Sequence, residues 1–405
     1  MTRPAASEHH TDDRLRTELL AIHTSAANFY ARRLTGSWAQ TYLIERVGSI
    51  NALIWRPGYA PGRWTSLTQH LRRQGHHDEA IEASGLALRI RTGRLVDRFR
   101  DRLVFPMLDD QGHPIAFVGR HHPRLDGSSG SPKYLNSPQT PLYTKGQHLF
   151  GLSHAQPALR SGALPVIVEG PLDAIAVTHH TGGQAVGVAL LGTALTSEQV
   201  DALHRLVHLD IRPVVLATDC DAAGRAAAAH AFGLLAARGA DPLVAALPDD
   251  QDPAGYIAQA GAAAFTDAVT TRARPLSQQL IADVAGGYAD RPARRTEDRV
   301  AAARAGARIV GQLTPNPDHR WERDIRYLAE ITGVQVSTAR AVVVDAGTAG
   351  SDNPDPALAA AAAAHADSSR TTPISGLAAP GFHPGDLSGS HRPPRAPTSS
   401  RSPHR

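Results

Sequence analysis

The chain has 405 residues, of which 42% are hydrophobic, and it contains a single cysteine, Cys220. This length allows two or three domains with cores of their own, and one cysteine excludes an intramolecular disulfide framework and a cysteine-rich zinc module within the chain. No apolar run reaches the roughly 18 to 20 residues that span a bilayer, and the polar N-terminus is not a secretory signal, so we expect a cytoplasmic protein with no membrane partner.

The formal net charge of +4 conceals an asymmetry along the chain. Residues 1–160 hold 21 Lys and Arg against 13 Asp and Glu, whereas residues 161–275 hold 6 against 12. A basic segment beside an acidic one suits a polyanion-binding surface next to a metal-binding site. Chance clustering of solvated charges is the alternative.

The N-terminal part is predicted to mix helices with short strands. A helix is expected from Asp12 to about Gly36, where Leu, Ile and Phe recur at helical spacing. Residues 38–90 are expected to be mostly helical, with breaks at two Pro-Gly pairs. Residues 94–120 contain two β-like runs around an Asp-Asp-Gln-Gly turn, and residues 121–132 are expected to form a polar loop rich in Gly and Ser.

From Leu164 onward, strands and helices are predicted to alternate. The expected strands cover residues 166–168, 185–191, 214–217 and 243–247, and the expected helices between them cover 172–180, 197–207 and 222–237. This alternation predicts a parallel α/β sheet with right-handed crossovers. Residues 276–346 are expected to be helical, and the tail after about Gly347 holds too little apolar bulk to order itself.

Carboxylates follow three of the predicted strands: Glu169 and Asp173, Asp219 and Asp221, and Asp249 and Asp252. In a parallel sheet the carboxyl ends of the strands face the ligand crevice, so we expect these groups at one edge. Carboxylates without His or Cys partners select a hard cation, which favours Mg²⁺ or Mn²⁺, with no zinc expected. Such ions can bridge a triphosphate and a 3′-hydroxyl in phosphoryl transfer. The alternative is that these acids are caps and loop residues.

The run Glu169-Gly170-Pro171-Leu172-Asp173-Ala174, followed by Asp219-Cys220-Asp221, closely resembles the TOPRIM domain. The resemblance covers roughly residues 164–275. That domain is shared by topoisomerases, bacterial primases, recombination mediators and some nucleases. The resemblance therefore implies the fold and the metal chemistry, and leaves the reaction open.

The flanking motifs resemble one family more specifically, the DnaG-type bacterial primases. The stretch from Asp97 to Met107, DRFRDRLVFPM, is similar to a motif of that family, and Gly119-Arg120 matches the end of the following hairpin. The stretch from Pro132 to Gly146, PKYLNSPQTPLYTKG, closely resembles the family's hallmark motif. The resemblance runs from about residue 13 to 275, and weakly to about 345.

The distribution of lysine supports this resemblance from within the sequence. The chain has 40 arginines and two lysines, Lys133 and Lys145, and both lysines lie in the hallmark motif. A compact, strongly hydrated ammonium meets a phosphate differently from a planar guanidinium. Lysine is therefore kept where a nucleotide is expected, with coincidence as the alternative.

The resemblance implies a set of metal ligands at the acidic edge. The central ligands are expected to be Glu169, Asp219 and Asp221. The supporting acids are expected to be Asp173, Asp249 and Asp252.

The resemblance also implies a basic groove beside those acids. Lys133 and Lys145 are expected to take part in catalysis and to contact nucleotide or template. Further nucleotide or template contacts are expected from Arg46, Arg120, Tyr134 and Asn136.

The expected fold class is α/β, with a TOPRIM parallel sheet preceded by a mixed α+β basic subdomain and followed by a small helical segment. The expected divisions are a disordered N-terminus (1–12), the basic N-terminal subdomain of the primase core (13–160), the TOPRIM domain (161–275), a helical C-terminal subdomain (276–346) and a disordered tail (347–405).

The expected function is template-directed synthesis of short RNA primers from NTPs on single-stranded DNA, by two-metal phosphoryl transfer. Family members begin with a zinc ribbon, which this sequence lacks, so a separate zinc-domain protein or a replicative helicase is an expected partner. The sequence has no P-loop and hence no fused helicase. The alternatives are a TOPRIM nuclease and a non-catalytic nucleic-acid-binding protein of a mobile element.

Overall fold

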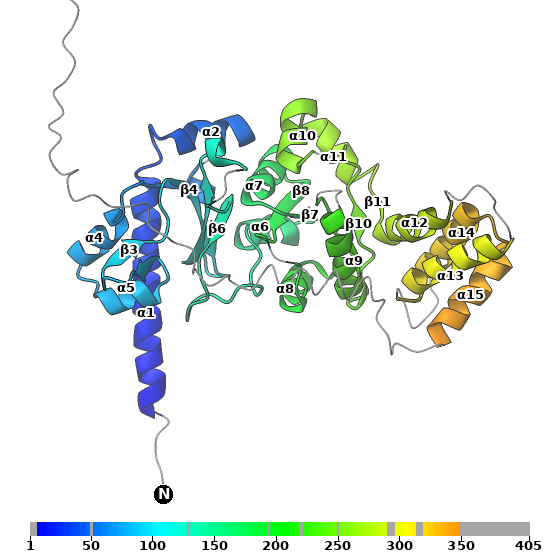
Figure 1. Ribbon diagram of the computed structural model, residues 1–405, viewed down its shortest axis with the longest axis horizontal. Coiled ribbons are helices and arrows are strands. Elements are labelled where there is room, and N and C mark those ends of the chain that lie inside the picture. The colour runs from blue at the N-terminus through cyan, green and yellow to red at the C-terminus, as the bar shows by residue number, and fades with distance from the viewer. Residues whose placement is uncertain are drawn as a thin grey trace, which may run out of the picture.

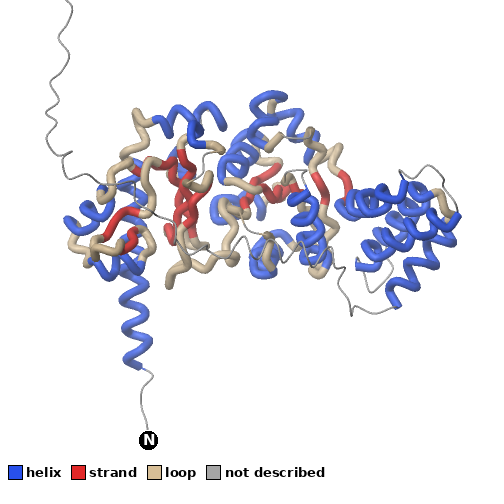
Figure 2. Tube along the Cα trace, in the orientation of Figure 1, coloured by secondary structure: helices blue, strands red, loops and turns tan. Residues whose placement is uncertain are grey.

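The structure, a computed structural model, describes residues 6–48, 52–127, 130–192, 194–218, 222–248, 251–289, 296–312 and 319–348. Its three parts follow one another along the longest axis (Figure 1). The N-terminal part lies at one end, a sheet with helices on both sides lies in the middle, and a bundle of helices lies at the other end (Figure 2). None of the described helices is long and apolar enough to cross a membrane.

The N-terminal part is built on a four-stranded antiparallel sheet in the order β1-β4-β5-β6. Every residue of β5 is buried, and α1 packs against β1 and β5. Its elements are α1 (Ala6–Ala31), α2 (Trp38–Val47), α3 (Ala52–Trp55), β1 (Gly58–Ala60), α4 (Ser66–Arg73), α5 (Asp78–Ala83), β2 (Ala87–Arg89), β3 (Leu95–Asp97), β4 (Arg102–Leu108), β5 (Pro114–His121), the 3-10 turn η1 (Pro123–Leu125) and β6 (Tyr134–Asn136).

Local chemistry explains the β4–β5 hairpin. The side chain of Asp109 accepts hydrogen bonds from the backbone N–H groups of Gln111 and His113, at 3.0 and 2.8 Å. Gly112 has φ 83°, which a residue with a side chain rarely adopts. The turn predicted between the two β-like runs is therefore present, with the runs longer than expected.

The helices of this part differ from the prediction at two points. The first helix begins at Ala6 and ends at Ala31, earlier at both ends than expected. The region 38–90 contains the short strands β1 and β2 as well as helices. Strands of three residues carry too little alternation to be recognised in a sequence, because pairing with β4 and β3 defines them.

The middle part contains the predicted parallel sheet, in the order β11-β10-β9-β7-β8. Its strands β7 to β10 are parallel, which confirms the expected fold class, and β11 adds an antiparallel edge that the sequence did not indicate. The elements are α6 (Leu152–Arg160), β7 (Leu164–Val168), α7 (Pro171–His180), β8 (Ala185–Ala189), α8 (Ser197–Val207), β9 (Val215–Leu216), α9 (Ala222–Ala236), β10 (Leu243–Val244), α10 (Pro253–Ala260), α11 (Ala262–Val269) and β11 (Arg274–Pro275).

The two faces of this sheet belong to different cores. Val166 and Val168 of β7 join a core that includes α7, α10, α11 and the N-terminal part. Ile167 points to the opposite face and joins a core with α6, α8, α9 and the C-terminal helices. Both faces are therefore covered, which is why these strands are continuous apolar runs.

The C-terminal helices are α12 (Leu276–Ala289), α13 (Thr296–Gln312), α14 (His319–Thr332) and α15 (Val336–Thr348). One ion pair, made by α14, attaches them to the segment before β10. Arg323 of α14 binds Asp241, which precedes β10, at 2.6 Å, and the buried Asp324 at 2.9 Å. The expected disorder of the tail falls on residues that lie mostly outside the described part, and the domain boundaries stay predictions.

Candidate functional site

Glu169 lies at the carboxyl end of β7, an inner strand of the sheet that pairs with β8 and β9. Its side chain is exposed, and its backbone carbonyl accepts a hydrogen bond from Leu191 N–H at 3.1 Å. Ile167 pairs with Leu216 of β9, so the carboxyl ends of β7 and β9 lie next to one another. Asp219 and Asp221 follow β9 and lie outside the described residues.

Asp173 lies in the first turn of α7 and is buried, with 8% of its surface exposed. One carboxylate oxygen accepts a hydrogen bond from the backbone N–H of Ala254, at the start of α10, at 3.2 Å. A Cβ at Gly170 would lie 3.0 Å from the other oxygen, so a side chain larger than hydrogen would crowd it. Asp173 thus joins the β7–α7 turn to the N-terminus of α10, where the helix dipole favours negative charge.

Asp252 caps the same helix. It accepts a hydrogen bond from Gly255 N–H at 2.6 Å, and its two oxygens accept from one guanidinium nitrogen of Arg46 at 2.8 and 2.6 Å. Burial alone would lower the pKa of Arg46, but the Asp252 carboxylate outweighs burial and raises it. The predicted groove residue Arg46 is therefore paired with a predicted supporting acid, and Asp249 lies outside the described residues.

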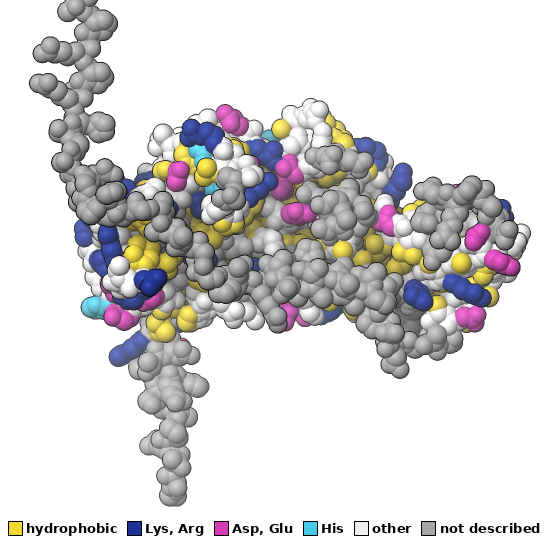
Figure 3. Space-filling view, viewed as in Figure 1, with side chains coloured by type: hydrophobic (Ala, Val, Ile, Leu, Met, Phe, Trp, Pro, Cys, Tyr) yellow, Lys and Arg dark blue, Asp and Glu magenta, His cyan; other side chains and the backbone are white. Residues whose placement is uncertain are grey.

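Basic and acidic side chains lie beside one another on the face between α2 and α10 (Figure 3). The resemblance of the acidic motif to the TOPRIM domain implies use of a divalent metal. Within the described ranges, no three His, Cys, Asp or Glu side chains gather closely enough to hold a metal ion. The donors nonetheless fit such an ion, because Glu169 is an exposed carboxylate at the strand edge next to the end of β9.

Tyr134 of β6 contacts this acidic edge. A Cβ at Gly170 would lie 3.6 Å from the Tyr134 hydroxyl, so the phenol covers the β7–α7 turn. Burial, reinforced by the nearby Asp173 carboxylate, raises the pKa of Tyr134. The hallmark motif and the acidic motif are therefore in contact, which neither motif could show alone.

Arg120 lies behind Tyr134 and is 1% exposed. Its guanidinium carbon lies 5.5 Å from the ring centroid of Tyr42 and 5.6 Å from that of Tyr134. It donates to Asp126 at 2.7 Å and to the backbone carbonyl of His121 at 2.9 Å. Sequence reasoning missed Tyr42 and Asp126, although Tyr42 stands four residues before Arg46 and so shares its helix face.

Lys133 is exposed on the loop before β6, and Arg102 holds that loop. Arg102 donates to Ser131 Oγ at 2.6 Å, to the Pro132 carbonyl at 3.0 Å and to the Lys133 carbonyl at 3.4 Å. Burial, followed by repulsion from Arg120, lowers the pKa of Arg102 to about 10. Arg102 was part of the motif in the sequence, but its supporting role depends on the fold.

Lys145 is also exposed, on a loop that docks against α8. Thr196, which caps α8, donates to the carbonyl of Gly146, and Gln199 Nε2 donates to the carbonyl of His148 at 2.8 Å. The two lysines thus stand on loops fixed by different parts of the chain.

Asn136 connects β6 to the loop after β8. Its side-chain nitrogen donates to the carbonyl of Leu191, whose N–H donates to the carbonyl of Glu169. Arg98 in turn donates to the Asn136 carbonyl at 3.0 Å. The predicted contact residue Asn136 is therefore linked through one residue to the backbone of the predicted metal ligand.

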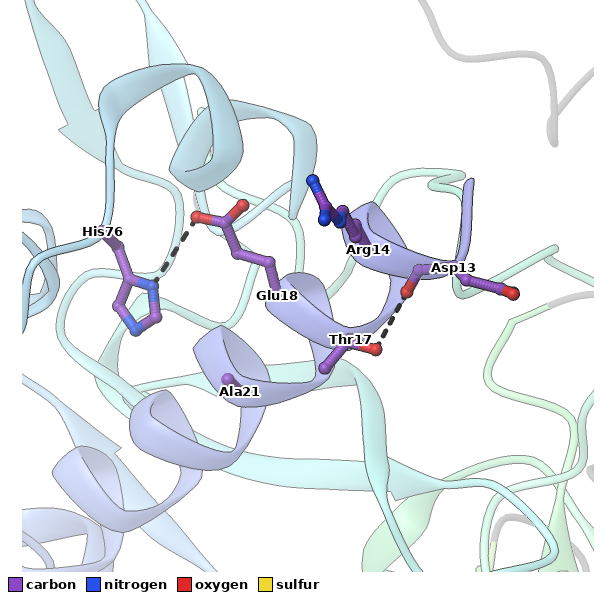
Figure 4. A pocket seen from close by; sticks show the side chains of 6 residues that line it. All are labelled: Asp13, Arg14, Thr17, Glu18, Ala21 and His76. Atoms are coloured by element: carbon purple, nitrogen blue, oxygen red, sulfur yellow. Dashed lines mark hydrogen bonds and ion pairs between the residues drawn. The ribbon is translucent and has the colours of Figure 1, made fainter. Parts of the chain in front are cut away.

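A surface pocket lies elsewhere, beside α1 (Figure 4). In it, His76 lies 3.9 Å from Glu18, and Thr17 donates to the carbonyl of Asp13. No predicted site residue lines this pocket, whose lining residues are Asp13, Arg14, Thr17, Glu18, Ala21 and His76.

Two family models match the chain in succession. The DNA primase catalytic core, N-terminal domain, matches residues 29–156, and a Toprim-like domain matches residues 166–257. The chain belongs to the DnaG-type DNA primase catalytic-core family.

Individual relatives support this membership. The DNA primase of Mycobacterium tuberculosis strain H37Rv is 36% identical over 318 residues, which cover 76% of this chain and 48% of the relative. The DNA primase of Halalkalibacterium halodurans is 37% identical over 254 residues, which cover 61% of this chain and 40% of the relative. The chain therefore spans about half the length, or less, of these curated relatives.

Solved structures show the same likeness in the fold over about four-fifths of this chain. The RNA polymerase domain of Mycobacterium tuberculosis primase DnaG, in complex with double-stranded DNA, has a TM-score of 0.66 and 34% identity, and the match covers 79% of this chain and 99% of that chain. A DNA primase domain from Pseudomonas aeruginosa has a TM-score of 0.66 and 31% identity, with 80% and 99% covered. The predicted resemblance is confirmed.

Proposed function

We propose that this chain is the catalytic core of a DNA primase, which joins ribonucleotides into short RNA primers on a single-stranded DNA template. One observation carries the proposal beyond family membership: Tyr134 of the hallmark motif lies against the Gly170 turn between Glu169 and Asp173. A groove for nucleotides beside carboxylates suits synthesis, because the incoming triphosphate and the acids must meet.

Glu169, Asp219 and Asp221 are the proposed central ligands for Mg²⁺ or Mn²⁺, with Asp173, Asp249 and Asp252 as supporting acids. When bound, such ions activate a 3′-hydroxyl and neutralise the charge that develops on departing pyrophosphate. Asp173 and Asp252 support this edge by holding the N-terminus of α10 and by pairing with Arg46.

The basic residues have the proposed role of holding the polyanions. Lys133 and Lys145 are exposed, and each presents a compact ammonium to phosphate. Arg46, Arg120, Tyr134 and Asn136 complete the proposed groove. Arg120 is buried, so its effect on a nucleotide passes through its neighbours.

The proposed partners are single-stranded DNA and NTPs, with a replicative helicase or a separate zinc-domain protein as further partners. A DnaG primase catalytic domain bound to single-stranded DNA has a TM-score of 0.64 and 27% identity to this chain. That complex supports a DNA template here.

Incubation of the protein with a single-stranded template, labelled NTPs and Mg²⁺ or Mn²⁺ tests the proposal. Short RNA products are expected, and Glu169→Gln is expected to reduce them on the order of 100-fold or more, because a metal ligand contributes several kcal/mol. Glu330→Gln, the same change on the exposed face of α14, is the matched control. Strand cleavage without synthesis would favour a TOPRIM nuclease, and salt-sensitive binding without any product would favour a non-catalytic role.

A further inference from the structure

The loop between β5 and β6 carries one acid, Asp126, directly after η1. One carboxylate oxygen accepts from Arg120 at 2.7 Å, and the other lies 2.8 Å from His121 Nε2. Neighbouring residues of a strand point to opposite faces of the sheet, so this carboxylate holds side chains from both faces of the strand end.

Asp126 is much more exposed to solvent than the two side chains with which it pairs. The side chain of Asp126 is 44% exposed, whereas those of Arg120 and His121 are 2% and 3% exposed. Burial would raise the pKa of Asp126, but the hydrogen bonds from Arg120 and His121 outweigh burial and lower it. Asp126 is therefore the anion that compensates a buried guanidinium.

No second carboxylate shares this task among the described residues. Arg120 otherwise donates to the His121 carbonyl at 2.9 Å, and its Nε has no hydrogen-bond partner within the described part of the chain. A buried charge that loses its partner is strongly unfavourable, so Arg120 would leave its position without Asp126.

Arg120 in turn supports Tyr134. Its guanidinium lies over the rings of both Tyr42 and Tyr134, and the Tyr134 hydroxyl lies against Gly170. A continuous set of contacts thus leads from Asp126 through Arg120 and Tyr134 to the turn that follows Glu169.

We propose that Asp126 is a positioning residue for nucleotide binding: it holds Arg120 against Tyr42 and Tyr134, and so fixes the Tyr134 ring beside the acidic edge. This inference rests on the proposed primer synthesis. The hydrogen bonds and ion pairs of Asp126 go to Arg120 and His121, and Lys133 acts on it only as a nearby charge, so its loss weakens nucleotide binding more than it slows the chemical step.

The variants separate charge from shape. Asp126→Asn keeps the size and removes the charge, Asp126→Glu restores the charge, and Asp110→Asn removes an exposed charge at the opposite end of the same hairpin. For the full chain, KM for NTP is expected to rise about tenfold in Asp126→Asn, since a hydrogen bond to a charged group is lost. In Asp126→Asn, kcat is expected to stay within about threefold of the wild-type value. Asp126→Glu is expected to lower KM at least part of the way back to the wild-type value. Asp110→Asn is expected to have the wild-type kcat and KM.

Equilibrium binding of a fluorescent NTP analogue gives a readout without turnover. Primer synthesis by the wild type and by Asp110→Asn tests the proposed function, and the binding comparison tests Asp126 even if synthesis fails. An unchanged dissociation constant in Asp126→Asn overturns the inference. Tighter binding also overturns it, since Asp126 would then compete with phosphate for Arg120. A third outcome also overturns the inference: in Asp126→Asn kcat falls by the same factor as KM rises, Tm is lower, and Asp126→Glu recovers neither kcat nor KM. That result would indicate that Asp126 has a purely structural role.

Discussion

The side-chain amide of Asn136 donates a hydrogen bond to the carbonyl of Leu191 at 2.8 Å. Leu191 has φ 58°, a left-handed conformation that is uncommon for a residue with a branched side chain. Strained residues persist where surrounding contacts fix them, often at functional sites. Here the contacts come from Asn136 on one side and the Glu169 carbonyl on the other.

The first prediction concerns this contact. In Asn136→Asp a carboxylate faces the Leu191 carbonyl, so the donor is lost and repulsion replaces it. Stability is expected to fall by about 1–3 kcal/mol, measured by urea unfolding, because a partly buried carbonyl loses its partner. The Mg²⁺ concentration for half-maximal synthesis is expected to rise, since the Glu169 backbone loses its fixed neighbour.

Asn28→Asp is the matched control for that change. Asn28 is exposed and accepts a hydrogen bond from Arg56 at 2.8 Å, so a new negative charge there meets a cation. Its stability is expected to be unchanged or slightly higher. Equal stability of Asn136→Asp and the wild type would contradict the proposed link.

The second prediction concerns Arg46, which is paired with Asp252. If Arg46 also contacts a template phosphate, Arg46→Gln should make DNA binding less sensitive to salt. The slope of the logarithm of the binding constant for single-stranded DNA, plotted against the logarithm of the salt concentration, should fall in magnitude by about 0.7. Fluorescence anisotropy at several salt concentrations measures that slope. Arg72→Gln removes a similar ion pair, with Asp78, on α4. Equal slopes for the two variants would mean that Arg46 only holds Asp252.

The sequence predicted the parts of the site that are local. Glu169 stands at a strand end because an apolar run stops there, and the helix Ser197–Val207 was predicted with its observed bounds because it is amphipathic and begins after a capping Thr196. The bounds of this helix could be predicted because they depend on residues that are adjacent to one another in the sequence.

The parts that escaped prediction depend on distant residues. The pairs Arg46–Asp252 and Asn136–Leu191 join segments whose approach follows from tertiary packing, which no periodicity encodes. Asp126 lies among Gly, Ser and Pro, which are typical of a loop, and its importance comes from a buried arginine outside that loop. The antiparallel edge strand β11 has two residues, too few to show alternation.

The third prediction concerns His23, which is buried in α1 and stacks on Phe117 at 5.9 Å between ring centroids. Burial, which outweighs the hydrogen bond to the Leu19 carbonyl, lowers the pKa of His23 to about 4. The unfolded chain then binds more protons than the folded chain below a pH of about 6.5, so stability falls as the pH drops from there toward 4.

The expected loss is on the order of 3 kcal/mol across that window. Urea unfolding between pH 4.5 and 7.5 measures it. His23→Phe, which cannot titrate, should show a shallower dependence, whereas His319→Asn, at an exposed position, should retain the wild-type dependence. Parallel curves for His23→Phe and the wild type would refute the assignment.

The fourth prediction concerns two glycines with opposite surroundings. A Cβ at Gly187 of β8 would lie 2.5 Å from Ala174 Cα and 2.6 Å from its carbonyl oxygen, both backbone atoms of α7. Gly187→Ala must therefore push α7 away from the strand, next to the turn that carries Glu169. We expect a loss of about 1–3 kcal/mol in the free energy of unfolding, the usual cost of overpacking.

Gly233 lies in α9 with nothing within 4 Å of an added Cβ. Because alanine is the better helix former, Gly233→Ala should stabilise the protein by about 0.5–1 kcal/mol. Urea unfolding of both variants gives the two signs, and stabilisation by Gly187→Ala would show that α7 does not pack as closely on β8 as described.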